Sequence, residues 1–119
     1  MPKRTRIGLI VPSSDATYEA DFMLARPSNV SLHSHRVPLP VEDSGEKGMD
    51  DMNAGIADAA RSLITANIDG IAFGGTTASF YKGPGYDEEL IKLIEDTSGL
   101  PGVVTSYSVV QALHFFNAK

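Results

Sequence analysis

The stretch Arg6-Ile7-Gly8-Leu9-Ile10-Val11-Pro12-Ser13-Ser14-Asp15 decides the fold. Its apolar run, residues 7–11, stops at a proline, which is typical of a short strand buried on both faces of a parallel sheet. Ser13, Ser14 and Asp15 are residue types that begin helices, because their side-chain oxygens accept hydrogen bonds from the free N–H groups of a first turn. The stretch therefore predicts a buried strand that leads directly into a helix at about residues 15–24.

The rest of the chain repeats this alternation of apolar runs and helical patterns. We predict further strands at residues 30–38, 68–73 and 103–105, and further helices at residues 49–63, 87–98 and 109–116. The second strand is more polar and is expected at a sheet edge, and residues 74–79 form the turn after the third strand. Strands that alternate with helices pair in parallel through right-handed crossovers. The sequence therefore predicts a three-layer αβα, flavodoxin-like α/β fold, with a four-stranded parallel sheet in the order 2-1-3-4.

The helical patterns also predict which side chains face the core. A continuous helix at residues 49–63 would place an apolar stripe on one face, consisting of Met49, Met52, Ile56, Ala60 and Leu63. The helix at residues 87–98 would turn Leu90, Leu93, Ile94 and Thr97 inward. Asn67 stands where a helix often ends in a left-handed residue.

Length and composition restrict the class of protein. The chain has 119 residues, of which 42% are hydrophobic, and its net charge is −5; we expect residues 1–119 to form a single α/β domain. The basic residues do not gather beyond positions 3–6, so no face suits nucleic acid. No apolar run approaches the roughly 20 residues of a membrane span or the roughly 7–15 of a signal-peptide core. We therefore expect a cytoplasmic protein with no nucleic-acid or membrane partner.

Two loops are expected to form the binding site. Ligands of open parallel sheets bind beyond the carboxyl ends of the strands, at the switch in strand order, which here lies between the first and third strands. The loops at that point are Pro12–Asp15 and Gly74–Thr77. Their backbone N–H groups and hydroxyls are donors that favour small anions. Each loop alone would also be explained by helix capping and turn formation, but their expected proximity favours a site.

Other chemistry is less well supported by the residues. No glycine-rich phosphate motif follows the first strand, so a nucleotide cofactor is disfavoured. His33 and His35 share one face of the second strand, but an edge-strand pair without a nearby acid is more often structural than a metal site. His114 is expected on the surface. Tyr81 could donate a proton near the third-strand loop, although packing beneath that loop is the commoner role.

Several segments together resemble the aspartate/glutamate racemase superfamily, specifically its maleate isomerase and arylmalonate decarboxylase branch. The matching stretches are residues 6–14, Ile71-Ala72-Phe73-Gly74-Gly75-Thr76-Thr77-Ala78-Ser79-Phe80, Gly83-Pro84-Gly85-Tyr86-Asp87, Leu100-Pro101 and Val109-Val110-Gln111-Ala112-Leu113. The resemblance covers nearly the whole chain. It implies a family of enzymes with two similar α/β halves and the active site between them, and this chain resembles the first half only.

The resemblance also implies roles for the loop residues. The racemases and isomerases of the family use two cysteines, one per half, whereas the decarboxylases keep the second and have glycine at the first position. Gly75 stands at that first position, and this chain has no cysteine. Thr76 and Thr77 match hydroxyl residues that contact a carboxylate. Asp15 replaces a typical asparagine, and an ionised carboxylate only accepts hydrogen bonds, so it would repel an anion unless protonated or turned away to cap its helix.

Two functions follow from the resemblance and from these departures. The first is a cofactor-independent decarboxylase, isomerase or racemase of small carboxylic acids, with Gly75, Thr76, Thr77, Ser13, Ser14 and Asp15 as substrate-binding residues and no metal or cofactor. Its catalytic residues are unknown; Tyr81 or Asp15 would have to move protons in place of a thiolate.

The alternative is a truncated, non-catalytic module that binds a small carboxylate or dicarboxylate or a protein partner. In both cases we expect a homodimer. A flavodoxin-like mononucleotide binder or receiver domain is disfavoured, since no phosphate loop or acidic cluster follows the first strand.

Overall fold

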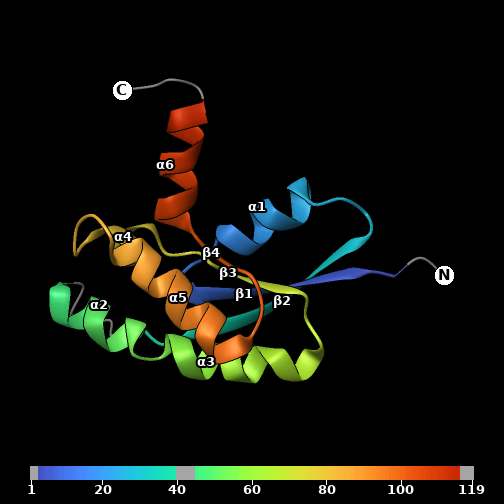
Figure 1. Cartoon of the computed structure of the whole chain (residues 1–119). Helices are drawn as coiled ribbons and strands as arrows, with labels where there is room; N and C mark the ends of the chain where they lie inside the picture. The colour runs from blue at the N-terminus through green and yellow to red at the C-terminus, as the bar shows by residue number, and fades with distance from the viewer. Residues whose placement is uncertain (1–2, 40–44, 116–119) are drawn as a thin grey trace.

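The computed structural model describes residues 3–39 and 45–115, apart from the side chains of Thr76, Thr77 and Ser106. Strands and helices alternate along this part of the chain (Figure 1). In order they are β1 (Thr5–Pro12), α1 (Tyr18–Ala25), β2 (Val30–Val37), α2 (Glu46–Asn53), α3 (Ile56–Leu63), the 3-10 turn η1 (Ile64–Ala66), β3 (Gly70–Phe73), α4 (Thr76–Phe80), α5 (Tyr86–Ser98), β4 (Gly102–Val104) and α6 (Thr105–Phe115).

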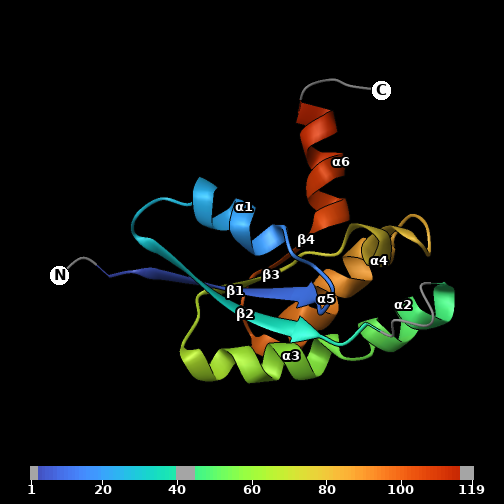
Figure 2. The same ribbon diagram turned by 180° about the vertical axis from the view of Figure 1, so that it is seen from behind.

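The four strands form one parallel sheet in the order β2-β1-β3-β4, which confirms the fold predicted from the sequence. β1 lies between β2 and β3, with Gly8 opposite His33 on one side and opposite Ile71 on the other. β2 is an edge strand, as its polar residues suggested. In Figure 2 the arrowheads of β1 and β2 end on the side of the sheet where α2 and α4 lie. The loops that follow β1 and β3 therefore open at the same end of the molecule.

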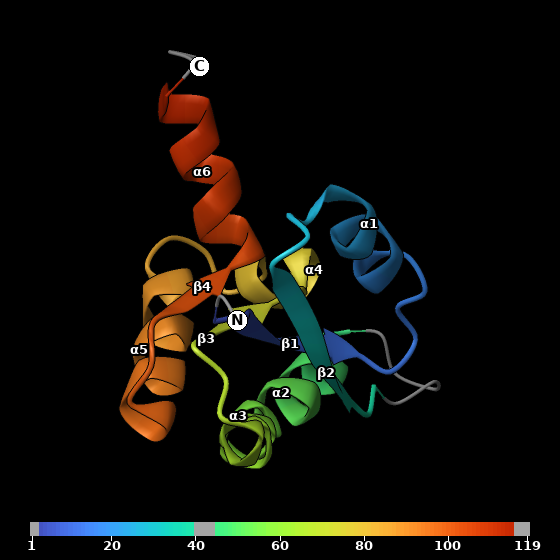
Figure 3. The same cartoon turned by 90° about the vertical axis from the view of Figure 1, so that its right-hand side faces the viewer.

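Helices cover the two faces of the sheet unequally. α2, α3 and α5 lie on one side and α1 and α6 on the other (Figure 3). The first side carries the main core, in which Ile10, Ile56 and Ile94 are fully buried. Each such side chain contributes about 1.5–3 kcal/mol relative to an exposed one. α1, by contrast, buries no residue, and α6 projects away from the sheet.

The helix expected at residues 49–63 is two helices, which corrects the prediction of one continuous element. α2 ends at Asn53 and α3 begins at Ile56, with Gly55 between them. A Cβ atom at position 55 would lie 2.9 Å from Val37 Cγ1 on the neighbouring strand, so the chain passes too close to the sheet for a larger residue. The apolar stripe itself is confirmed, because Met49, Met52, Ile56, Ala60 and Leu63 are all buried.

Further differences are local and have identifiable causes. The turn predicted at residues 74–79 contains the short helix α4, closed by a hydrogen bond of 3.0 Å from Ser79 N to the Gly75 carbonyl. Leu93 was expected to face inward but is 37% exposed, since Leu90 and Ile94 take the inner face of α5. Asn67 has φ 54° and ψ 47°, the left-handed conformation that was predicted.

Element ends shift by a few residues from the predicted bounds. α1 begins three residues later than expected, at Tyr18, and α6 begins at Thr105 rather than Val109. The predicted end of that last helix, Phe116, lies outside the described residues. Within residues 3–39 and 45–115, no helix has the length and apolar character needed to cross a membrane.

Candidate carboxylate-binding site

The loops after β1 and β3 lie next to each other at the carboxyl end of the sheet. Gly74 N donates to the Ile10 carbonyl at 2.8 Å, which ties the end of β3 to the end of β1. Between these loops and α2 lies a cavity of about 720 Å³. Its lining consists of Pro12, Ser14, Asp15, Ala16, Thr17, Tyr18, Leu39, Met49, Met52, Gly74, Gly75 and Ala78. The switch point predicted from the strand order thus coincides with this cavity.

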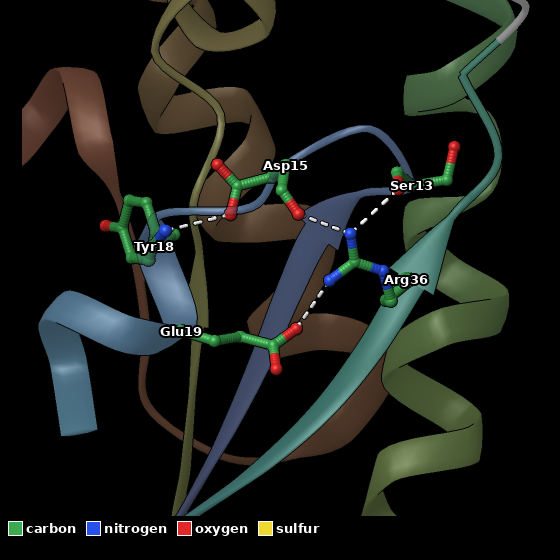
Figure 4. Close-up of polar contacts among 5 residues, drawn as sticks. All are labelled: Ser13, Asp15, Tyr18, Glu19 and Arg36. Atoms are coloured by element: carbon green, nitrogen blue, oxygen red, sulfur yellow. Dashed lines mark hydrogen bonds and ion pairs between the residues drawn. The ribbon is translucent and has the colours of Figure 1, made fainter.

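The β1–α1 loop is a tight turn followed by a helix cap. Asp15 N donates to the Pro12 carbonyl at 3.0 Å, and the Asp15 carboxylate accepts a hydrogen bond of 2.9 Å from Tyr18 N (Figure 4). Asp15 Oδ2 therefore satisfies an N–H group at the start of α1. The Asp15 carboxylate thus contacts the start of α1, and Asp15 also lines the cavity.

Ser13 and Ser14 have different surroundings. Ser13 Oγ accepts a hydrogen bond of 2.9 Å from Leu39 N, so its side chain secures the segment after β2, and Ser13 does not line the cavity. Ser14 does line it. The structure thus brings Ser14 and Asp15 together with Gly75 around one space, while the side chain of Ser13 supports that arrangement from outside.

Arg36, near the end of edge strand β2, is bound to the outer side of the same loop (Figure 4). Its Nη2 atom donates to the Ser13 carbonyl at 2.8 Å and also to the Asp15 carbonyl, and its Nη1 atom donates to Glu19 Oε1 at 2.7 Å. One guanidinium group thus joins β2, the β1–α1 loop and the first turn of α1. The pairing with Glu19 offsets the positive charge locally.

The β3–α4 loop is shaped by close ring contacts on its two glycines. A Cβ atom at Gly74 would lie 2.9 Å from three atoms of the Tyr18 ring, and one at Gly75 would lie 2.7 Å from Phe73 Cζ. The hydroxyl of Thr105 donates to the Phe73 carbonyl at 3.1 Å and lies 3.3 Å from the Tyr18 hydroxyl, which is therefore the donor of that pair. The Tyr18 ring thus packs against Gly74, and its hydroxyl is held by Thr105 at the start of α6.

Thr76 and Thr77 open α4 directly after these glycines. The first N–H groups of an α-helix have no partner within the helix, so they are available to an anion near its start. The side chains of both threonines lie outside the part of the chain that the structure describes.

The remaining wall of the cavity is apolar. Leu39, Met49, Met52 and Ala78 line it, and the last three are buried. No arginine, lysine or histidine is among its lining residues within the described ranges. A bound anion would consequently be held by N–H and hydroxyl donors rather than by an ion pair.

A second polar cluster joins α2 to the end of α4, outside the cavity. The Tyr81 hydroxyl donates to Asp50 Oδ1, and Lys82 Nζ lies 3.1 Å from the same oxygen. These two contacts hold the pKa of Asp50 below its ordinary value, the Tyr81 hydrogen bond having the larger effect. Burial, followed by the Asp50 hydrogen bond, raises the pKa of Tyr81, so its hydroxyl stays protonated at neutral pH. Tyr81 does not line the cavity.

The histidines take structural positions. His33 Nε2 lies 2.9 Å from Ser31 Oγ on its own strand, and His114 is exposed on α6. Among the described residues, no group of three or more histidine, aspartate or glutamate side chains could hold a metal ion.

Sequence reasoning found both loops but missed Tyr18, Arg36 and Leu39. Tyr18 had a detectable signal, because an aromatic residue three positions after a capping aspartate falls in the first turn of the following helix. Arg36 had a weaker one, a charged residue near the end of a strand beside the predicted site. Leu39 is brought to the cavity by the path of the chain after β2, which no local pattern indicates.

This fold and this loop pair define a class of α/β protein with a cavity at the switch point of its parallel sheet. The chain belongs to the arylmalonate decarboxylase family, whose model matches residues 7–119. The resemblance inferred from the sequence is thereby confirmed. A maleate isomerase of Pseudomonas putida is 30% identical over 131 aligned positions, which cover 100% of this chain and 52% of the relative.

Solved structures agree with this assignment. Arylmalonate decarboxylase superposes with a TM-score of 0.75 at 26% identity, over 92% of this chain and 45% of that one. The maleate isomerase Iso from Pseudomonas putida S16 superposes with a TM-score of 0.82 at 20% identity, over 94% of this chain and 49% of that one. A third structure is a Nocardia farcinica maleate cis-trans isomerase mutant with a covalently bound succinylcysteine intermediate. It superposes with a TM-score of 0.80 at 23% identity, over 92% of this chain and 48% of that one. The chain spans about half the length of the relatives it matches, and the matching part is their N-terminal half.

Proposed function

We propose that this chain binds a small dicarboxylate in the cavity between the β1–α1 and β3–α4 loops. The observation that carries the proposal is the convergence of Ser14, Gly75 and Ala78 of α4 on one cavity at the switch point of the sheet. Backbone N–H groups and the hydroxyls of Thr76 and Thr77 would donate to the carboxylates. Solved maleate isomerases that share this fold are described with maleate or with a succinylcysteine intermediate, which supports a ligand of this class.

The chain would then supply one half of the active site of a cofactor-independent decarboxylase, isomerase or racemase. In decarboxylation, the C–C bond to one carboxylate breaks and CO₂ leaves. The electron pair of that bond moves toward the remaining carboxylate, and a proton is then added at the α-carbon. Donors at Gly75, Thr76 and Thr77 would stabilise the negative charge that develops on the remaining carboxylate. The proposal therefore treats residues 1–119 as one α/β domain equivalent to the first half of a two-halved enzyme.

A second candidate is a non-catalytic carboxylate-binding module. The observation in its favour is that the chain has no cysteine and that Gly75 stands where the isomerases of the family carry their first thiol. The space at Gly75 is also closed to a larger side chain by the Phe73 ring. Binding requires only donors that the chain has, whereas proton transfer requires an acid or base from elsewhere.

We also propose that the chain forms a homodimer through α6. Val109 and Leu113 are one turn apart on this projecting helix and are 41% and 48% exposed. Neighbouring apolar side chains on a helix that packs weakly are typical of a surface covered by another chain.

Titration calorimetry with a matched ligand pair tests the binding proposal. Phenylmalonate and phenylacetate differ by one carboxylate, and we expect the first to bind and the second to bind much more weakly. Thr76→Ala should weaken phenylmalonate binding by roughly tenfold, because a hydrogen bond to a charged group is lost, while Thr76→Ser should retain most of the affinity. Equal binding of both ligands, or an unchanged affinity in Thr76→Ala, would contradict the assignment of the loop.

Incubation in D₂O separates the two candidate functions. Arylmalonates, maleate and aspartate are supplied in turn, and loss of CO₂, isomerisation and deuterium uptake at carbon are measured at high protein concentration. Turnover of any of them would support an active enzyme. Binding by calorimetry with no turnover of any substrate would support the non-catalytic module.

A further inference from the structure

The guanidinium group of Arg36 fixes the direction of two peptide units in the β1–α1 loop. Its Nη2 atom donates to the carbonyl oxygens of Ser13, at 2.8 Å, and of Asp15 (Figure 4). Nη2 carries two hydrogens, so it can serve both carbonyls at once. Both carbonyls therefore point toward the same side of the loop.

The opposite side of the loop must then present N–H groups. In a planar trans peptide, the carbonyl and the N–H of the same unit point in opposite directions, and no described peptide bond is cis. The N–H partners of these two carbonyls belong to Ser14 and Ala16. Both N–H groups are thus directed away from Arg36.

The side away from Arg36 is the side of the cavity. Ser14 and Ala16 line the cavity of about 720 Å³, which does not include Arg36. Arg36 borders a second hollow of about 350 Å³, together with Glu19 and Met23. Asp15 and Ala16 line both spaces, as expected for the loop between them, and Ser14 lines the cavity alone. The loop therefore separates the guanidinium group from the space where a ligand would bind.

Both N–H groups are free to bind a ligand. Neither Ser14 N nor Ala16 N donates a hydrogen bond within the described part of the chain, whereas Ser13 N and Asp15 N donate to the carbonyls of Val37 and Pro12. The Asp15 carboxylate has no hydrogen to donate, and it accepts from Tyr18 N. Two nearby, unpaired N–H groups on one concave surface form a favourable site for an anionic oxygen.

We propose that Arg36 is a positioning residue that turns the Ser14 and Ala16 N–H groups into the cavity, where they bind one carboxylate of the ligand. The inference rests on the dicarboxylate-binding function proposed above and identifies the donors on the β1–α1 side. Arg36 does not touch the ligand; it acts through the two carbonyls that it holds. A backbone pair of donors takes the place of the side-chain amide that asparagine would supply at position 15.

Amide-resolved NMR of the full chain, titrated with phenylmalonate, tests the inference. In the wild-type protein, the Ser14 and Ala16 amide resonances should shift together with those of Gly75 to Ala78. In Arg36→Met, the shifts at Ser14 and Ala16 should be lost and the affinity should fall by roughly tenfold, while the shifts at Gly75 to Ala78 persist. Arg36→Lys, a point donor without the planar fork, should give an intermediate loss.

The chain contains a matched control for the removal of an arginine. Arg26 also binds backbone carbonyls, at 2.7 Å from Val30 O and 3.4 Å from Pro27 O, but at the other end of α1. Arg26→Met removes the same charge and should leave both sets of shifts and the affinity unchanged. If Arg36→Met does not fold, the comparison of Arg36→Lys with Arg26→Met carries the test.

The outcomes distinguish this inference from the function on which it rests. If Gly75 to Ala78 shift in the wild-type protein but Ser14 and Ala16 do not, the positioning role is wrong and the binding function stands. If no amide near the cavity shifts at millimolar phenylmalonate, both are wrong. Equal loss of affinity in Arg26→Met and Arg36→Met would reduce the effect to net charge and overturn the inference.

Discussion

A Cβ atom added at Gly75 would lie 2.7 Å from Cζ of the Phe73 ring, closer than side-chain carbons approach one another in folded proteins. Phe73 is fully buried, at 0% exposure, so its ring is held within the core. Gly75 is therefore matched in size to Phe73, two positions before it. Restoring a side chain there would require the core to change as well.

Gly75→Cys should destabilise the protein by about 1–3 kcal/mol, the usual cost of overpacking a core. Combining it with Phe73→Leu should cost less than the sum of the two single substitutions, because the smaller residue relieves the contact. Urea unfolding of the four proteins in the cycle measures the coupling. Additive changes would show that the two positions do not compete for the same space.

Asp15→Ala should lower stability by about 0.5–2 kcal/mol, because Tyr18 N at the start of α1 loses its acceptor. Asp15→Asn is the matched control: its side-chain oxygen can still cap the helix, and we expect little change in stability. Thermal unfolding of both variants measures the difference. Similar losses in the two variants would mean that the charge of Asp15, and not its capping bond, is what stabilises the loop.

Lowering the pH should reduce the stability of the fold, in part through protonation of the Asp69 carboxylate. Its Oδ2 atom accepts a hydrogen bond of 2.9 Å from Arg6 N, and this contact holds the pKa of Asp69 below its ordinary value of 3.8. A carboxyl group with a lowered pKa stabilises the fold above that ordinary value, and the contribution is lost as the pH falls through the lower, folded-state pKa.

Asp69→Asn should accordingly show a smaller drop in unfolding midpoint than the wild-type protein between about pH 5 and about pH 3. Urea titrations at a series of pH values measure this. Asp58, which pairs with Arg61 at 2.8 Å on α3, offers a control: Asp58→Asn removes one carboxylate without removing a hydrogen bond to a backbone N–H. Identical slopes for wild type and Asp69→Asn would rule out the contribution of this carboxyl group.

Leu113→Glu should convert the proposed dimer to monomer, because it places a charge on the exposed apolar face of α6. Gel filtration with light scattering at micromolar concentration gives the mass. Leu24→Glu is the control, since Leu24 is 87% exposed on α1 rather than on α6, and its substitution should leave the mass unchanged. A wild-type protein that is monomeric at this concentration would contradict the proposal.

The fold could be predicted from the sequence because its signals are local. The apolar run of β1 ends at Pro12 and is followed directly by capping residues, so strand, loop and helix are all encoded within ten residues. The left-handed Asn67 is equally local. The helix break at Gly55 could not be predicted in this way, since it depends on the approach of Val37, eighteen positions earlier in the chain.

The site could be predicted in part, for the same reason. The strand order brings the loops at Ser14 and Gly75 together, and their small polar residues suggest anion binding. The state of Asp15, by contrast, depends on Arg36 holding its carbonyl from the edge strand and on Tyr18 presenting an N–H group. The Tyr18 contact is local, but the Arg36 contact joins positions 21 residues apart, so residue type alone left the role of Asp15 open.

The central claim is that a dicarboxylate binds between the two loops, and a crystal structure of the chain with phenylmalonate tests it most directly. We predict electron density in the cavity, with one carboxylate at hydrogen-bond distance from the N–H groups of Ser14 and Ala16 and the other at the start of α4, beside Gly75 and Thr76. An empty cavity in crystals grown at saturating phenylmalonate, or density for the ligand only at another surface, would contradict the account.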